Sequence, residues 1–120
     1  MNTLLFVYGT LKRGCSNHAQ IAAQKFVAEA RTVPGHRLFD MGGYPGIALH
    51  PSDRDGVTGE VWSIDPECLA RLDHFEGVHE GLYCRQSIPL LPPFAGRTID
   101  AYVSARPVES LRALGSTWAE

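Results

Sequence analysis

The chain has 120 residues, of which 44 % are apolar and 20 % are charged, and its net charge is −2. This length predicts one globular domain over residues 1–120 and excludes a separate cofactor-binding domain beside a substrate domain. The near balance of 11 basic and 13 acidic residues gives no electrostatic reason to expect a nucleic-acid or anionic-membrane partner.

The chain start and the cysteines predict a cytoplasmic protein. The first residues carry no basic segment, and no apolar stretch approaches the roughly 18 residues of a membrane span, so we expect neither a signal peptide nor a transmembrane helix. Cys15, Cys68 and Cys84 are odd in number and widely spaced, which argues against a disulfide framework and favours a reducing compartment. We interpret Cys68 and Cys84 as buried apolar residues.

The first half of the chain reads as short strands separated by turns. Its 12 glycines and 8 prolines favour many turns over long helices. Asn17 is placed to cap a short helix over residues 18–24. Strands are predicted where apolar runs or alternating patterns end at turn residues: 4–8, 26–33, 36–41, 47–50 and 57–64.

The second half contains the clearest helix signal. Asp65 can cap the first amides, Pro66 suits the first helical position, and Gly77 is placed to end the helix. Strands over residues 83–91 and 98–105 and a short helix over residues 109–114 follow. This pattern predicts an α+β fold with a mixed, mostly antiparallel sheet that is curled or closed into a small barrel, flanked by short helices.

A glycine-containing turn follows the first strand at residues 8–14 (YGTLKRG). A phosphate-binding P-loop requires Lys and then Ser or Thr after its second glycine, but Cys15 and Ser16 follow Gly14 here. The pattern is therefore not that of a nucleotide site. An ordinary strand-ending turn and a cluster of backbone N–H groups that binds a carboxylate or an oxyanion both stay open. A later turn, around Tyr44, could line a pocket, although turn chemistry alone explains its sequence.

The segment 72–83 contains two histidines and two glutamates. It lacks the H-E-x-x-H spacing of a zinc site and crosses a helix end, so we expect no metal. Glu76 lies at the predicted end of the helix, where the helix dipole disfavours a carboxylate and raises its pKa, as a general base requires. A solvated surface glutamate explains the same pattern. Trp62 and Phe75 are predicted core residues.

Several of these segments, taken in order, resemble the gamma-glutamyl cyclotransferase family, the AIG2-like proteins that include gamma-glutamylamine cyclotransferases. Residues 6–11 (FVYGTL) resemble the family's Y-G-S/T-L loop after the first strand. Residues 43–46 (GYPG) resemble its G-x-Y-P-G turn, and residues 59–62 (GEVW) resemble its G-E-V/L-W/Y strand.

The resemblance continues through the second half of the chain. Residues 72–77 (LDHFEG), followed by Tyr83 and Arg85, resemble the family segment L-D-x-x-E-G…Y-x-R. Residues 115–118 (GSTW) resemble a weaker family ending, with one extra residue. Each motif is moderately specific, and their common order over nearly the whole chain is more specific than any one of them.

The resemblance implies a small mixed β-barrel and a reaction without a cofactor. In this reaction the α-amine of a small gamma-glutamyl compound attacks its own γ-carbonyl and releases 5-oxoproline with an amine or amino acid. The matching positions imply Glu76 as the catalytic residue. They imply a substrate-binding set of Tyr8, Gly9, Thr10, Leu11 and Tyr83, to which we add Tyr44 from the second turn.

Two other functions stay open at this stage. The same fold could serve as a non-catalytic module that binds a small molecule in the retained pocket. A weaker alternative is a metal hydrolase that uses His74, Glu76 and His79. The sequence leaves open which gamma-glutamyl compound is the substrate and whether the chain self-associates.

Overall fold

A computed structural model describes all 120 residues of the chain. It contains seven strands, one α-helix and two short 3-10 helices. In chain order they are β1 (Thr3–Val7), η1 (His18–Gln20), β2 (Lys25–Arg31), β3 (His36–Asp40), β4 (Pro45–Leu49), β5 (Thr58–Ile64), α1 (Pro66–Phe75), η2 (Val78–Glu80), β6 (Tyr83–Ser87) and β7 (Asp100–Ser104).

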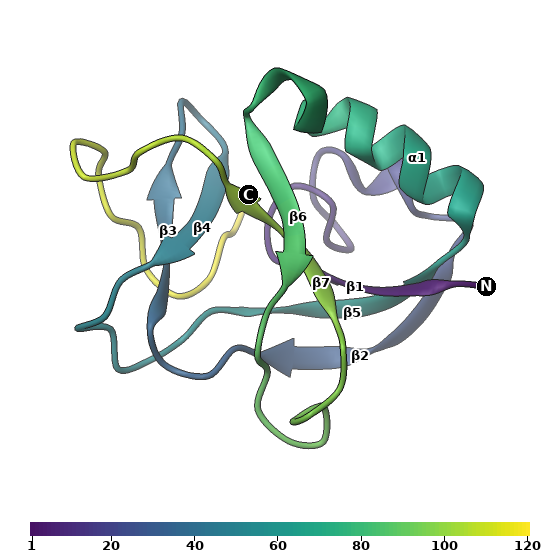
Figure 1. The fold of residues 1–120 in the computed structure, drawn as a ribbon, viewed down its shortest axis with the longest axis horizontal. Helices are drawn as coiled ribbons and strands as arrows, with labels where there is room; N and C mark the ends of the chain where they lie inside the picture. The colour runs from purple at the N-terminus through teal and green to yellow at the C-terminus, as the bar shows by residue number, and fades with distance from the viewer.

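The strands form one mixed sheet in the order β2-β5-β1-β7-β4-β3, with β6 also paired to β7. Four strand pairs are antiparallel, and β7 runs parallel to β1 and β4. Two backbone hydrogen bonds join the end of β2 to the segment after β6: the Val33 amide donates to the Pro89 carbonyl, and the Leu91 amide donates to the Arg31 carbonyl. The sheet curls because these bonds bring its β2 edge next to that segment. The predicted α+β class is therefore confirmed, although the barrel is curled rather than fully closed (Figure 1).

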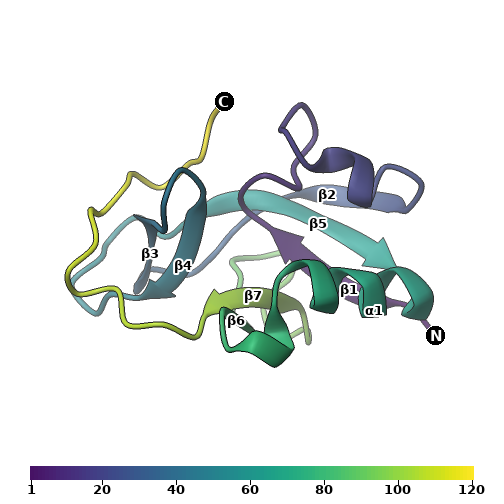
Figure 2. The same ribbon diagram turned by 90° about the horizontal axis from the view of Figure 1, so that it is seen from above.

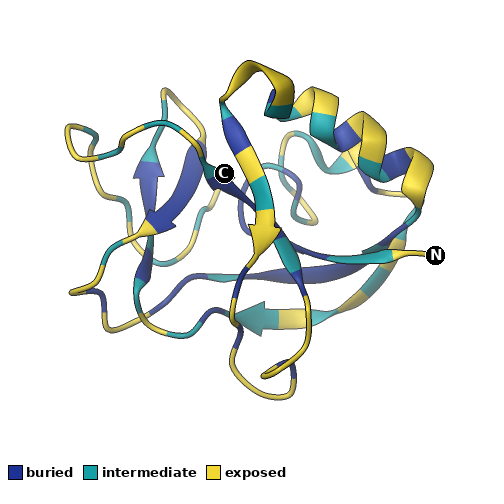
Figure 3. Ribbon diagram, in the orientation of Figure 1, coloured by how far each residue is buried: buried dark blue, intermediate teal, exposed yellow.

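Apolar residues alternate along β1 and β5 and so divide the core into two parts. Phe6 and Val61 pack inside the curled sheet, whereas Leu5 and Trp62 point to the side on which α1 lies. Figure 2 shows α1 running beside β1 and β5. The face of the helix turned toward these strands is buried and its outer face is exposed (Figure 3). This packing holds the C-terminal end of α1 in place.

The helix α1 begins and ends as its sequence predicts. The Asp65 side chain accepts a hydrogen bond from the Cys68 amide at 2.7 Å, and Pro66 is the first helical residue. Regular helix stops at Phe75, and Glu76 is the C-cap. Gly77 has φ of +68°, a left-handed conformation that a side chain would strain.

Three local predictions are wrong. Residues 109–114 form no helix, because this segment hydrogen-bonds to β3 instead: the Leu114 amide donates to the Leu38 carbonyl. The helix expected over 18–24 is only the 3-10 turn η1, since the Asn17 side chain donates to the Thr10 hydroxyl rather than capping it. Cys84 is exposed, whereas Cys68 is buried as predicted.

None of the helices has the length and apolar character that a membrane span requires.

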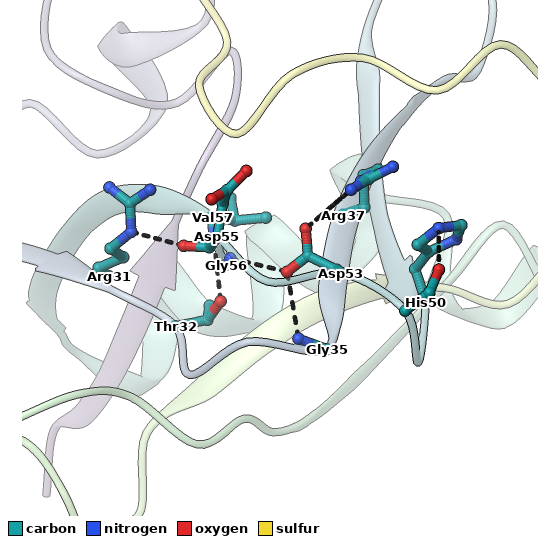
Figure 4. A network of polar contacts seen from close by, with 10 residues as sticks. Arg31, Thr32, Gly35, Arg37, His50, Asp53, Asp55, Gly56 and Val57 are labelled. Carbon is teal, nitrogen blue, oxygen red and sulfur yellow. Dashed lines mark hydrogen bonds and ion pairs between the residues drawn. The ribbon is translucent and has the colours of Figure 1, made fainter.

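The turn between β4 and β5 is organised around one buried carboxylate. Asp53 accepts hydrogen bonds from the Gly56 amide at 2.7 Å and the Gly35 amide at 3.1 Å, and it pairs with Arg37 at 3.2 Å (Figure 4). Burial opposes ionisation of this group, but these partners outweigh it and lower the pKa of Asp53. The carboxylate therefore holds the start of β3 against the start of β5.

Candidate active site

One cavity of about 360 Å³ opens between the β1 end, the C-terminal end of α1 and the turn before β4. This volume falls within the range of roughly 300–1,000 Å³ typical of small-molecule sites. All seven residues predicted for the site line this cavity: Tyr8, Gly9, Thr10, Leu11, Tyr44, Glu76 and Tyr83. The other lining residues are Phe6, Val7, Ser16, Asn17, Gly43, Pro45, Phe75, Leu82 and Tyr102.

The loop after β1 is fixed from several sides. Buried Glu60 accepts hydrogen bonds from the Arg13 backbone amide, the Arg13 side chain and the Trp62 indole, each at 3.1 Å. The Asn17 amide donates to the Thr10 carbonyl at 2.8 Å. At Gly9 a Cβ atom would lie 2.6 Å from the Pro45 ring, so only glycine allows the loop to approach this turn so closely.

The backbone amides of this loop are free to bind a ligand. No hydrogen bond within the protein uses the N–H groups of Gly9, Thr10 or Leu11 as donors, although these residues line the cavity. Buried backbone donors are usually paired, because an unpaired one costs free energy. Because the loop is held rigidly by its neighbours, its amides need little reorganisation to receive an anionic or carbonyl oxygen.

The floor of the cavity is formed by three tyrosines that are nearly inaccessible to solvent, namely Tyr8, Tyr83 and Tyr102. The Tyr8 hydroxyl donates to the Tyr102 carbonyl at 2.6 Å, and the Tyr83 hydroxyl donates to the Pro45 carbonyl at 2.8 Å. Burial is the main cause that raises the pKa of both Tyr8 and Tyr83 above the ordinary value. These rings therefore stay neutral at physiological pH and define the shape of the cavity.

An ion-pair network supports the floor from below. Arg85 binds Asp73 through two nitrogens, at 2.9 and 3.2 Å, and binds Asp100 at 2.9 Å. Asp73 also accepts a hydrogen bond from the Tyr102 hydroxyl at 2.7 Å. Burial opposes the charge on Asp73, but hydrogen bonds from Arg85 and Tyr102 outweigh it and lower the pKa of this carboxyl. The network thereby connects α1, β6 and β7 beneath the cavity.

Glu76 differs from every other carboxylate around the cavity. It is partly buried, and its side chain has neither a hydrogen bond nor an ion pair within the protein. Burial raises the pKa of the Glu76 carboxyl to about 7. The C-terminal end of α1 acts in the same direction, because its partial negative charge disfavours an anion. Such a group can both accept and return a proton near neutral pH.

The histidines of this segment do not join Glu76 in a metal centre. His74 and His79 are exposed, on α1 and η2 respectively. No group of three or more His, Cys, Asp or Glu side chains is placed to hold one ion. The metal-hydrolase alternative therefore has no ligand set in this segment.

Part of the cavity wall is formed by residues that the sequence patterns did not assign to the site. Phe75 was predicted as core, but its ring is 42 % exposed and lines the cavity, because the helix ends there. Tyr102 lies within the strand predicted over residues 98–105, and no function was predicted for it. Tyr102 and Asp100 are two residues apart and therefore share one face of β7, and Arg85 lies opposite Tyr102 on β6. These positions were the available signals for the network beneath the cavity. Nothing in the sequence marked Leu82.

Comparison with known proteins agrees with these features. The family described as gamma-glutamyl cyclotransferase, AIG2-like, matches residues 5–119. The chain is 38 % identical over 80 residues to gamma-glutamylaminecyclotransferase of Homo sapiens, covering 61 % of this chain and 52 % of that protein. It is 33 % identical over 72 residues to gamma-L-glutamyl-butirosin B gamma-glutamyl cyclotransferase of Niallia circulans, covering 60 % and 44 %. The matched region thus spans about half the length of these relatives.

Solved structures show the same architecture over nearly the whole chain. An AIG2-like protein of Mus musculus matches with a TM-score of 0.76 and 29 % identity, covering 96 % of this chain and 87 % of that one. Protein ytfP of Escherichia coli matches with a TM-score of 0.68 and 30 % identity, covering 97 % and 95 %. By sequence and by fold, this chain belongs to the gamma-glutamyl cyclotransferase, AIG2-like family.

Proposed function

We propose that this protein is a cytoplasmic gamma-glutamyl cyclotransferase that converts a small gamma-glutamyl compound into 5-oxoproline and a free amine or amino acid. The observation that carries the proposal is the pairing, around one cavity, of an unpartnered carboxyl of pKa about 7 at Glu76 with the free backbone amides of residues 9–11. Two relatives with cyclotransferase names support the reaction class.

In the proposed reaction Glu76 moves the proton that the chemistry requires. The α-ammonium of the substrate gives a proton to the Glu76 carboxylate, and the resulting amine attacks the γ-carbonyl carbon. A carbon–nitrogen bond forms in the ring, and the original amide bond breaks. Glu76 passes its proton to the departing nitrogen as this bond breaks. The ring nitrogen loses its second proton to the regenerated Glu76 carboxylate, and that proton leaves with the product amine, which departs as an ammonium. One carboxylate of pKa about 7 suits these transfers.

The cavity supplies shape and dipoles to this step. Ring closure is already unimolecular, so holding the glutamyl chain bent toward attack lowers the barrier substantially. The amides of residues 9–11 would hold the substrate α-carboxylate or the oxygen that becomes negative during attack. Tyr8, Tyr44 and Tyr83 would confine the glutamyl chain. We propose that no metal or organic cofactor takes part, because the substrate brings its own nucleophile.

The test is 5-oxoproline formation from a panel of gamma-glutamyl amines and amino acids. We expect turnover with at least one compound and a loss of about 10²–10⁴-fold in kcat with Glu76→Gln. Glu80→Gln is the matched control, because Glu80 lies nearby in η2 but is exposed and outside the cavity. Unchanged turnover in Glu76→Gln would remove Glu76 from the mechanism. Ligand-dependent thermal stabilisation without any turnover would identify a binding module instead.

A further inference from the structure

A second charged group lies beside the cavity and has no role in the reaction as described. Arg106 follows β7 by two residues, and the Ser104 hydroxyl fixes its backbone by donating to the Arg106 carbonyl at 2.9 Å. The preceding Ala105 amide donates to the carbonyl of Leu82, a residue of the cavity wall. The chain is therefore held against the cavity at the point where the Arg106 side chain begins.

The Arg106 guanidinium reaches the rim of the cavity. Its Nη2 donates to the Tyr44 hydroxyl at 3.3 Å. Tyr44 lines the cavity and is 37 % exposed, whereas Tyr8, Tyr83 and Tyr102 form the buried floor, so this contact lies at the mouth. The Arg106 charge also acts on the Tyr83 hydroxyl, where it opposes the larger effect of burial that raises the pKa of Tyr83.

The guanidinium is incompletely satisfied in the protein. Its Nε is buried and has no hydrogen-bond partner, and no carboxylate forms an ion pair with it. Arg85, the other arginine near the cavity, is by contrast bound by two aspartates beneath the floor. An arginine that stands at the rim of a cavity and is paired with no carboxylate of the protein is suited to receive one from a ligand, which the guanidinium can bind with two parallel hydrogen bonds.

We propose that Arg106 is a specificity residue that binds the carboxylate of the leaving group, so that the preferred substrates are gamma-glutamyl amino acids or peptides rather than gamma-glutamyl amines. This inference rests on the proposed function and names its substrate class. In the proposed complex the loop amides would hold the glutamyl end, and the leaving group would extend toward Tyr44 and Arg106 at the mouth. There the Arg106 guanidinium, which no carboxylate of the protein neutralises, can pair with a carboxylate on the leaving group.

The experiment compares three compounds that share the glutamyl half. Their leaving groups are anionic (gamma-glutamyl-alanine), neutral (gamma-glutamyl-alaninamide) and cationic (mono-gamma-glutamyl-ethylenediamine). We expect kcat/KM to fall by about tenfold from the anionic to the neutral compound and further for the cationic one. Arg106→Gln should abolish this order. It should lower kcat/KM for the anionic compound, leave kcat/KM for the neutral compound unchanged and raise kcat/KM for the cationic compound. Arg106→Lys should keep part of the order.

A binding measurement separates this inference from the proposed reaction. Calorimetry on the Glu76→Gln protein, with and without Arg106→Gln, compares the affinities for the anionic and neutral compounds without turnover. A tenfold preference for the anionic compound that disappears with Arg106→Gln supports the role of Arg106. This holds even if the wild type forms no 5-oxoproline, because the absence of product would reject only the proposed reaction. Equal affinities, or an equal loss for both compounds in Arg106→Gln, would overturn the role of Arg106.

Discussion

Asp53 is a buried carboxylate and Glu76 a partly buried one, and their surroundings shift the pKa values of the two carboxyls in opposite directions. Asp53, in the turn between β4 and β5, accepts two backbone N–H groups and pairs with Arg37, which lowers the pKa of its carboxyl. Glu76, at the end of α1, has no such partner, and burial raises the pKa of its carboxyl to about 7. The hydrogen bonds and the ion pair of Asp53 make it a structural residue. Glu76 has no such partners and is therefore free to exchange a proton with a ligand.

The largest expected effects are those of Glu76→Gln, which should change both the rate of catalysis and the stability of the fold. Catalysis should fall by about 10²–10⁴-fold, as the proton carrier is lost. The same substitution should stabilise the fold by about 1–3 kcal/mol above pH 7, because the folded protein no longer contains a poorly solvated charge. Urea denaturation of both proteins measures the second effect. A loss of stability in the variant would mean that Glu76 has a structural partner in solution.

The pH dependence of that stabilisation follows from the sign of the shift. The pKa of Glu76 is raised in the folded state, so the cost of ionisation is absent below the unfolded value near 4.3 and complete above about 7. The stability difference between Glu76→Gln and the wild type should therefore be close to zero at pH 4 and grow between pH 4.5 and 7. A difference that is constant with pH would contradict a raised pKa.

For Asp53 the expected effect has the opposite sign. Asp53→Asn removes the charge that Arg37 and two amides bind, and we expect a loss of about 2 kcal/mol, moderated because Arg37 is partly exposed. Its pKa is lowered in the fold, so this stabilisation is present above the unfolded value near 3.9 and is lost as pH falls further. Asp55→Asn is the control, since Asp55 is exposed in the same turn.

Activity separates the two sites further. Asp53 lies outside the cavity, so kcat/KM of the folded Asp53→Asn protein at a temperature well below its midpoint should equal that of the wild type. A large loss of activity under these conditions would show that the turn between β4 and β5 is coupled to the cavity.

A third carboxylate, Glu120, gives the smallest expected effect. It is exposed, and it accepts hydrogen bonds from the Ser16 amide at 2.8 Å and from the Ser16 hydroxyl at 3.1 Å. Ser16 lines the cavity, so Glu120 steadies the loop without touching the cavity itself. Glu120→Gln should raise KM two- to threefold and leave kcat unchanged, because a neutral amide oxygen still accepts one of these bonds. Steady-state kinetics with the best substrate measure this split.

The parts of the fold that the sequence predicts well are those governed by local signals. The cap at Asp65, the proline at position 66 and the glycine at position 77 are sufficient to define α1, and alternation defines β5. The predicted helix over 109–114 fails because its backbone bonds are made to β3, a partner that lies about 70 residues away in sequence and that no local pattern reveals.

The site shows the same division. The position of Glu76 at a helix end was readable from the sequence, and its function was suggested by resemblance. Its isolation from other charges was not readable, because it depends on Arg85 being taken up by Asp73 and Asp100 from other elements. Likewise, Arg106 reaches the cavity only because the chain after β7 is held against Leu82. Such features arise from the packing of distant segments.

The role of Glu76 as the proton carrier is tested most directly by a carbon-13 NMR titration of its side-chain carboxyl in the ligand-free protein. Comparison with Glu76→Gln assigns the signal. We expect this carboxyl to titrate near pH 7, about 2–3 units above ordinary glutamates. A titration near pH 4.3 would contradict this role, because Glu76 would then be a solvated surface carboxylate with no environment suited to carry the proton of the proposed reaction.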